Sequence, residues 1–242
     1  MTITSAPHHG GKAAHRSKLP YIVLTVGLVL GAIGVALIIS GSGGGSSGTT
    51  TQGSGIAATQ TRAVAPFSSL DLAGSNIVTV TVGAPQSVVV HADTNLLADI
   101  TTRVAAGTLI IGDTGSFTAR APMSVQVSVP VLTTLKLSGS GQISVTGINT
   151  PRLTVTLPGS GILNAAGTAT QLYITLGGSG EAQLGQLIAR DVHAVVSGSG
   201  LIQLTATTSL NAAVPGTGTI LYSGNPSQVT TSVTGTGTVT PG

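Results

Sequence analysis

Leu137-Ser138-Gly139-Ser140-Gly141-Gln142-Ile143 places a Gly-Ser-Gly triplet between two aliphatic residues, and the pattern returns as Gly-Ser-Gly or Gly-Thr-Gly down the C-terminal half of the chain. The first glycines of successive triplets are 20, 19, 20, 18 and 19 residues apart. Such a period is typical of one supersecondary unit stacked repeatedly, because each unit buries its apolar side only against its neighbours. The glycines of the triplets are Gly139, Gly141, Gly159, Gly161, Gly178, Gly180, Gly198, Gly200, Gly216, Gly218, Gly235 and Gly237.

Apolar residues recur at fixed offsets from these triplets. They stand two positions before the first glycine and four positions after it in every copy, and six positions before it in every copy but the first. Offsets of −6, −2 and +4 follow the two-residue period of a strand and not the 3.6-residue period of a helix. The rows are Leu137, Leu157, Leu176, Val196, Val214 and Val233; Ile143, Leu163, Ala182, Ile202, Ile220 and Val239; and Thr133, Leu153, Leu172, Val192, Leu210 and Val229.

The glycines indicate where each coil turns. A tight corner requires a positive φ, which glycine adopts cheaply, so we expect the triplets to be corners in that conformation. Gly147, Gly167 and Gly224, eight positions after their triplets, mark a second corner. Coils of this kind pair in parallel at ~4.8 Å. The sequence therefore predicts an all-β fold, a single parallel β-solenoid with coils of about 19–20 residues.

The expected domain covers residues 62–242, with an irregular part at 62–130 and the repeats at 131–242. Alternating residues predict strands at 76–83, 87–92, 108–111 and 123–130. Gly74-Ser75-Asn76 resembles a degraded first triplet, whereas 95–100 lacks alternation and fits a short helical turn or a loop. An atypical first part is typical of a solenoid, since terminal units cap the stack.

The charges divide the chain in two. The formal net charge of +3 is carried by Lys12, Arg16 and Lys18, and from Arg62 onward cations and acids balance. A neutral domain lacks the basic footprint that nucleic acid requires, so nucleic-acid binding is excluded. The chain has no cysteine, which excludes disulfides, a thiol nucleophile and a zinc–thiolate site.

The basic tail, residues 1–18, precedes an uncharged stretch at 19–39. These 21 residues would span ~31 Å as a helix, the thickness of a bilayer core. We expect an uncleaved transmembrane signal anchor with the N-terminus in the cytoplasm and the domain outside the cell membrane; the alternative is a cleaved signal peptide. A Gly/Ser/Thr-rich flexible linker is expected at 40–61.

Catalytic chemistry has little support in the sequence. Hydrolysis of a glycoside requires two carboxylates in one cleft, and the acids of the domain are scattered along it. We interpret them as solvated turn residues and expect no enzyme activity, no cofactor and no metal site. The acids are Asp71, Asp93, Asp99, Asp113, Glu181 and Asp191.

One outward row is a candidate binding face. It lies five positions before each triplet, and adjacent coils should bring Tyr173 beside His193, a plausible contact for a carbohydrate or a peptide. The alternative is the ordinary mixed decoration of a sheet surface. The row and the neighbouring lysine comprise Thr134, Thr154, Tyr173, His193, Asn211, Thr230 and Lys136.

Residues 62–242 resemble a family of bacterial envelope proteins. The segments Arg62–Phe67, Leu70–Gly74, Val88–Leu97 and Gly107–Ile111, followed by the serial triplets, are similar to the putative auto-transporter adhesin, head GIN domain family. The resemblance implies a right-handed β-helix-like fold and a role as an adhesin, and it supplies no catalytic motif.

Together these features predict a membrane-anchored module outside the cytoplasm that acts in adhesion or in the structure of the envelope. Its expected partners are a glycan or an envelope protein, and a second copy through the C-terminal coil, whose last strand would be uncovered. The alternatives are a sensor or regulatory domain that acts through a membrane partner and, less favoured, a polysaccharide-processing enzyme.

Overall fold

The computed structural model describes residues 50–242, which form seventeen strands and no helix. The predicted tail, the predicted membrane span at 19–39 and the first part of the predicted linker, 40–49, lie outside the described residues. Within residues 50–242 there is no helix that could cross a membrane. The all-β prediction is confirmed for this part of the chain.

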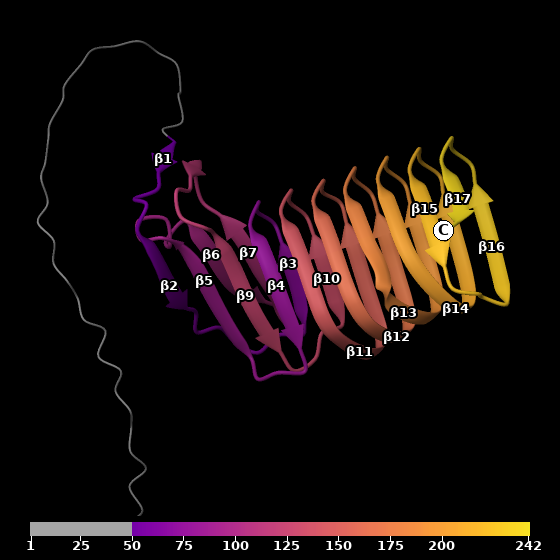
Figure 1. Ribbon diagram of the computed structural model, residues 1–242, viewed down its shortest axis with the longest axis horizontal. Coiled ribbons are helices and arrows are strands. Elements are labelled where there is room, and N and C mark those ends of the chain that lie inside the picture. Colours follow the sequence, from indigo (N-terminus) through magenta and orange to yellow (C-terminus); the bar gives the residue numbers. More distant parts are fainter. Residues whose placement is uncertain (1–49) are drawn as a thin grey trace, which may run out of the picture. The chain divides into compact units, whose positions relative to one another are not determined.

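The repeats stack as parallel coils, about five of them, seen side by side in Figure 1. Each triplet separates two walls of the solenoid. Wall A holds the strands that follow a triplet, and wall B holds the strands that lead into the next one. Four long strands contribute to both walls, namely β11 (Gln142–Leu157), β12 (Ile162–Leu176), β13 (Glu181–Val196) and β14 (Leu201–Val214).

Shorter strands complete the two walls at either end of the stack. Wall A also contains β4 (Ile77–Val82), β15 (Thr219–Ser223) and β17 (Thr238–Pro241). Wall B also contains β3 (Ser69–Leu72), β10 (Thr134–Leu137) and β16 (Gln228–Val233). The register places equivalent offsets opposite one another, for example Leu153 opposite Leu172 and Leu172 opposite Val192.

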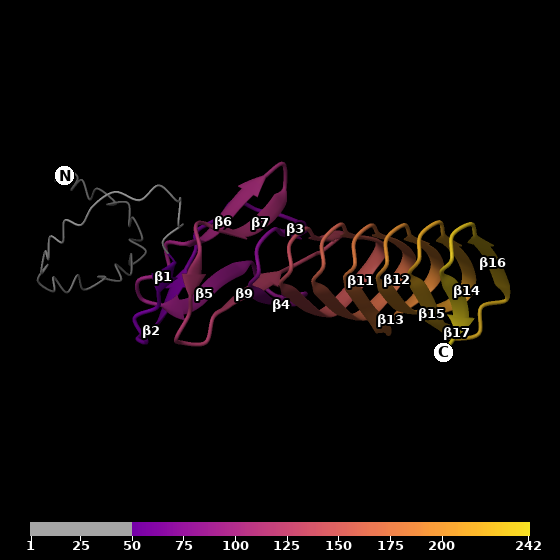
Figure 2. The same ribbon diagram turned by 90° about the horizontal axis from the view of Figure 1, so that it is seen from above.

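The segment between β4 and β10 forms an end that the repeat pattern does not describe (Figure 2). Two of its strands, β7 (Thr108–Asp113) and β9 (Ser124–Val129), extend the walls in parallel, next to β3 and β4. Two others pair antiparallel, β6 (Ile100–Ala105) with β7 and β5 (Ser87–Asp93) with β9. The prediction of a purely parallel solenoid is therefore wrong at this end, where the antiparallel strands β5 and β6 cover the outer edges of β9 and β7.

The domain begins earlier than predicted. Strand β2 (Ala57–Thr61), expected in the flexible linker, pairs antiparallel with β5, and β1 (Thr51–Gln52) pairs with β8 (Phe117–Thr118). These residues are polar and lack apolar alternation, so composition alone indicated a linker. Backbone pairing to an exposed strand edge holds them instead.

Alternate side chains of both walls fill one aliphatic core. Leu137, Leu157 and Leu176 are fully buried, as are Ile143 and Leu163 across from them. The predicted rows are thus inward rows over most of the stack. In the last coil the same offsets are uncovered, and Val229 and Val233 are 43% and 45% exposed.

The triplets are stacked corners, as predicted, but the reason given for their glycines is wrong. None of the triplet glycines has a positive φ. A Cβ on any of them would instead lie closer than 3.0 Å to the backbone of the corner one coil before, such as the carbonyl oxygen of Gly139 for Gly159. At the second corner the conformational argument holds, since Gly147 and Gly224 have φ of 79° and 90°.

Candidate functional site

The predicted binding row lies along wall B in one continuous register. Thr134 is opposite Thr154, Thr154 opposite Tyr173, and Tyr173 opposite His193. His193 is in turn opposite Asn211, and Asn211 opposite Thr230. The spacing of the triplets thus placed these side chains on one face.

The aromatic rings of this row are stacked on each other. The rings of Tyr173 and His193 are nearly parallel, at 6°, with centroids 5.0 Å apart. The guanidinium carbon of Arg152 lies 5.0 Å from the centroid of the Tyr173 ring. The Nη2 atom of Arg152 also donates a hydrogen bond to Gln171 Oε1 at 2.9 Å. Because β11 and β13 flank β12 on opposite sides, Arg152 and His193 cover the two faces of the Tyr173 ring. A sugar cannot stack on that ring without displacing one of them.

Lys136, the other residue predicted for this face, ties two coils together. Its Nζ donates to Asp71 Oδ2 at 2.9 Å, and Ser138 Oγ donates to the other oxygen of the same carboxylate at 2.7 Å. Asp71 belongs to β3 and both donors belong to the β10 side of the next coil. The ion pair between Lys136 and Asp71 therefore links the first coil to the repeats, and the Lys136 ammonium takes part in this structural contact.

The interpretation of the acids as solvated turn residues is wrong for Asp93. This side chain is fully buried and holds two separate segments of backbone, at Gly55 and at Arg120–Ala121. Its Oδ1 accepts from the Gly55 N–H at 2.6 Å, and its Oδ2 accepts from the Arg120 and Ala121 N–H groups at 2.9 and 3.1 Å. Burial alone would raise the pKa of Asp93, but hydrogen bonds from Ala121, Arg120 and Gly55 hold it below its ordinary value.

Two further acids have structural partners. Asp113 accepts from the Ser75 N–H at 2.9 Å and from Asn76, and so fixes the degraded first triplet. Asp191 accepts from Ser209 Oγ at 2.8 Å on the neighbouring strand. Within residues 50–242 no group of three or more potential ligands could hold a metal ion.

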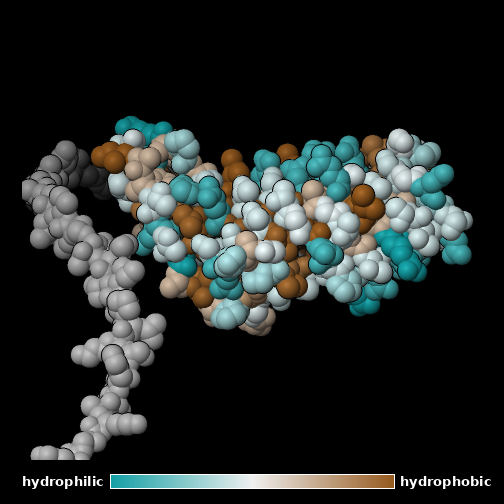
Figure 3. Space-filling view, turned by 60° about the horizontal axis from the view of Figure 1, so that its bottom comes forward, coloured by the Kyte–Doolittle hydropathy of each residue, from teal (hydrophilic) through white to brown (hydrophobic). Residues whose placement is uncertain are grey.

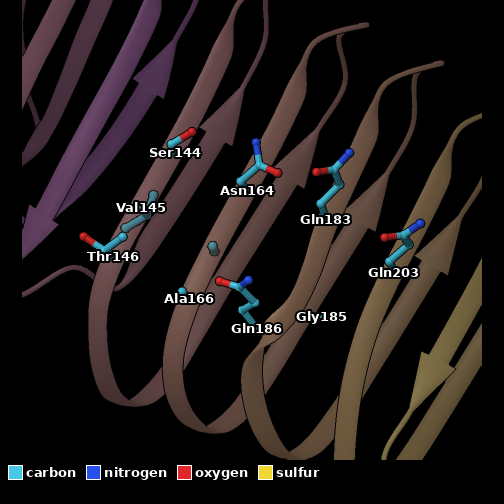
Figure 4. Close-up of a pocket in the computed structure, with 10 residues that line it drawn as sticks. Ser144, Val145, Thr146, Asn164, Ala166, Gln183, Gly185, Gln186 and Gln203 are labelled. Carbon is cyan, nitrogen blue, oxygen red and sulfur yellow. The ribbon is translucent and has the colours of Figure 1, made fainter.

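A polar groove on wall A was not predicted. It has a volume of about 310 Å³ and crosses β11 to β14. Figure 4 shows the amides of Asn164, Gln183 and Gln203 side by side on neighbouring strands. We call these three residues the amide ladder. The register sets each opposite the next, with Ser144 continuing the row on β11.

A bulge in β13 gives the groove its depth. Asn164 is opposite Gln183 but Ala166 is opposite Gln186, so β13 carries one more residue than β12 here. On its other side β13 carries three more residues than β14 between the pairs Leu184–Leu204 and Ile188–Thr205. The exposed Gln186 projects from this bulge, and the small residues Ala166 and Gly185 leave the hollow open. The Thr205 hydroxyl fixes the bulge by donating to Gly185 O at 2.9 Å.

The sequence did contain a signal for the ladder. Ser144, Asn164, Gln183 and Gln203 stand five positions after their triplets, as regularly as the aliphatic rows. The row was not predicted because it holds no aromatic or charged side chain, unlike the row on wall B. The bulge carries no such signal, since only the register of the folded walls reveals the extra residues.

The remaining surface is mixed in character. On the face drawn in Figure 3, hydrophilic and hydrophobic residues alternate in small areas. The exposed large hydrophobic side chains of the described residues lie apart on several strands, as Ile77 on β4 and Ile188 on β13 do. Scattered apolar residues of this kind are ordinary on a protein surface.

Solved structures share this architecture. A putative adhesin from Bacteroides fragilis matches 78% of this chain and 99% of its own, with 24% identity and a TM-score of 0.66. A putative lipid binding protein from Parabacteroides distasonis matches 80% of this chain and 100% of its own, with 19% identity and a TM-score of 0.53. At these identities the likeness concerns the fold alone. No curated protein matches the chain.

The family is shown by the sequence itself. Residues 66–226, two-thirds of the chain, match the family described as putative auto-transporter adhesin, head GIN domain. The match runs from just before the first strand of wall B to just after β15, and therefore includes most of the covered end, the first five triplets and the groove. The chain belongs to the putative auto-transporter adhesin, head GIN domain family.

Proposed function

We propose that this protein is a non-catalytic adhesin or interaction module of the bacterial cell envelope. The observation that carries the proposal is a rigid, closely packed solenoid whose outer walls present neutral polar side chains at regular intervals. Membership of an adhesin family supports it. So do the acids, because Asp71, Asp93 and Asp113 are engaged in holding backbone segments and neighbouring coils.

The proposed anchor is the uncharged stretch at 19–39, with the N-terminus in the cytoplasm and the solenoid outside. The basic residues before it and the balanced charge of the domain support this orientation. The test is protease treatment of intact cells that produce the full-length chain. Loss of the domain without cell lysis is expected, and a domain that resists until the membrane is opened would reject the topology.

Adhesion itself is tested with the same cells. Cells that display the full-length chain should bind envelope material or a coated glycan surface more strongly than cells that lack it. The matched control displays a chain with Asp93→Asn and Asp113→Asn, which weakens the fold and should reduce adhesion with it. Equal adhesion by all three cell types would contradict the proposal.

The wall B row is proposed as a secondary contact surface, reached through ring edges rather than ring faces. Tyr173 is half-buried and His193 is exposed, so the hydroxyl and the imidazole edge are available to a partner. Replacing Tyr173 and His193 together with alanine should reduce adhesion if this row takes part. Unchanged adhesion with an unchanged Tm would remove the row from the binding surface.

Self-association through the final coil is also proposed. All residues of β16 are exposed, and its outer edge faces no strand within residues 50–242. An exposed edge of this kind is a template for pairing with a second copy. Sedimentation of the full-length chain should show a dimer at high concentration, and a monomer throughout would reject the contact.

A further inference from the structure

We propose that the groove on wall A binds an extended neutral glycan, which lies along the solenoid axis across β11 to β14. The inference rests on the proposed function and names the ligand class for it. It starts from the chemistry of the lining, in which Asn164, Gln183, Gln186 and Gln203 supply four amides and Ser144 supplies a hydroxyl.

An amide is suited to a sugar hydroxyl because both groups donate and accept hydrogen bonds. Gln183 is already oriented for this. Its Nε2 donates to Glu181 Oε1 at 2.9 Å, which fixes the plane of the amide and leaves the carbonyl oxygen and a second N–H for a ligand. A positioned amide costs less entropy on binding than a freely rotating one.

The spacing of the ladder favours a polymer over a single sugar. Asn164, Gln183 and Gln203 come from three neighbouring coils, so they repeat at the ~4.8 Å spacing of adjacent strands. A linear chain of sugar rings offers hydroxyls at a similar repeat. Weak contacts that repeat along one ligand add to a useful affinity without any single strong one.

The groove is hollow enough to hold a linear chain of sugar rings. Ala166 and Gly185 carry little or no side chain at the base, and Gln186 projects from the β13 bulge beside them (Figure 4). A flat amide row would be solvated on all sides. The bulge instead places the Gln186 amide beside the ladder, so that a ligand in the hollow would meet amides on more than one side.

The lining of the groove favours a neutral glycan over an anionic glycan and over an extended peptide. Among the described residues, no charged side chain lines the groove, and the closest charged partner of the ladder is the acidic Glu181. An anionic glycan would therefore be repelled rather than attracted. An extended peptide would need free backbone groups for strand addition, and β12 and β13 are each paired on both edges.

The test measures binding of the full-length chain, purified in a detergent without a sugar headgroup, to arrays of neutral and anionic glycans. Selective binding to neutral linear glycans is expected. Because no ion pair is involved, that binding should change little between ~50 mM and ~500 mM salt. Binding only to anionic glycans, falling steeply with salt, or no binding to neutral glycans would overturn the assignment.

Variants locate the site. Gln183→Ala with Gln203→Ala should weaken binding roughly tenfold or more, since two hydrogen-bonding amides are lost. Ala166→Phe, which fills the base and removes no amide, should do the same. The matched control Asn149→Ala with Gln228→Ala removes two exposed amides elsewhere and should leave affinity unchanged.

Each outcome separates the site from the proposed function. One outcome is that the purified chain binds no glycan on the arrays while cells that carry the two ladder substitutions still adhere. In that case the adhesin proposal stands and the groove assignment falls. If glycan binding weakens equally in the ladder variant and the control at equal Tm, the site lies elsewhere and the assignment falls as well. Loss in the ladder and Ala166→Phe variants alone supports it.

Discussion

Each glycine of a triplet faces the backbone of the corner one coil before it. Gly159 and Gly178 illustrate the geometry, because a Cβ on either would run into the carbonyl oxygen of Gly139 or Gly159. The crowding allows corner N–H groups to reach across coils, as when Ser160 N donates to Gly139 O at 3.2 Å. Close approach, rather than backbone conformation, is the requirement that only glycine meets at these corners.

A substitution pair tests this account. Gly159→Ala should reduce the free energy of unfolding by about 1–3 kcal/mol, the usual cost of forcing extra atoms into a packed site. Gly177 stands directly before the triplet Gly178-Ser179-Gly180, but a Cβ there would lie 3.8 Å from its nearest neighbour, Ser197 Oγ, so Gly177→Ala should have little effect. Equal losses in denaturant titrations of the two variants would show that crowding is not the reason.

The buried Asp93 carboxylate makes the stability of the fold depend on pH. Its pKa is lowered in the folded protein, because the N–H groups of Ala121, Arg120 and Gly55 outweigh the effect of burial. The unfolded chain has an ordinary Asp pKa of about 3.9. The stabilisation is therefore fully present above that value, and it is lost as pH falls through the lower pKa of the folded state.

Asp93→Asn removes this dependence. An amide offers one acceptor oxygen where the carboxylate offers two, so the Tm at pH 7 should fall by several degrees. The gap between the two proteins should stay constant above about pH 5 and narrow below about pH 4, where the unfolded chain binds a proton at Asp93 that the folded protein, with its lower pKa, does not yet bind. Melting curves across this range measure it, and a gap that widens in acid would contradict the assignment.

Strands of the repeats are specified by rows of aliphatic side chains, and residues of one row contribute differently to stability along the stack. Val192 and Val229 hold equivalent offsets on wall B. Val192 is 1% exposed between two covered coils, whereas Val229 is 43% exposed in β16. Burial by neighbouring coils, not the residue type, decides what each valine contributes.

The two valines form a matched experiment. Val192→Ala should destabilise by about 1.5–3 kcal/mol, through lost burial and the cavity that remains. Val229→Ala should stay within about 0.5 kcal/mol, as expected for a surface position. Chemical denaturation of both variants measures the difference, and similar losses would mean that the last coil is covered in solution.

The sequence carried the elements of the repeats but not those of the covered end. A constant period fixes which residues of successive coils meet, so counting from the triplets predicts the register of β11 to β14 on both walls, though not the bulge in β13. Alternation identifies β5 and β9 as strands equally well, yet it is the same for parallel and antiparallel pairs. The antiparallel pairing of β5, and the docking of the polar β2 on it, depend on contacts between distant segments and had no local signal.

At the scale of the whole molecule, the two ends of the stack differ within residues 50–242, since only one of them is covered by antiparallel strands. The antiparallel strands β2, β5 and β6 close the stack next to β7 and β9, which in turn flank β3 and β4, and Asp93 and Asp113 hold the loops there. At the opposite end β16 and β17 each pair with one neighbouring strand of the walls. In a solenoid, stability is close to a sum of contacts between neighbouring coils, so the two ends should open with different free energies.

Amide hydrogen exchange should reveal this gradient. Among the repeat peptides, those from 228–241 should exchange fastest, because every residue of β16 is exposed and the coil has one neighbour. Peptides from β13, paired on both edges, should exchange slowest, with β3 and β4 close behind them under their cover. Mass spectrometry of the full-length chain resolves these segments. Uniform protection from 69 to 241 would mean that the coils open as one cooperative unit, and that the final coil is held by something beyond its single neighbour.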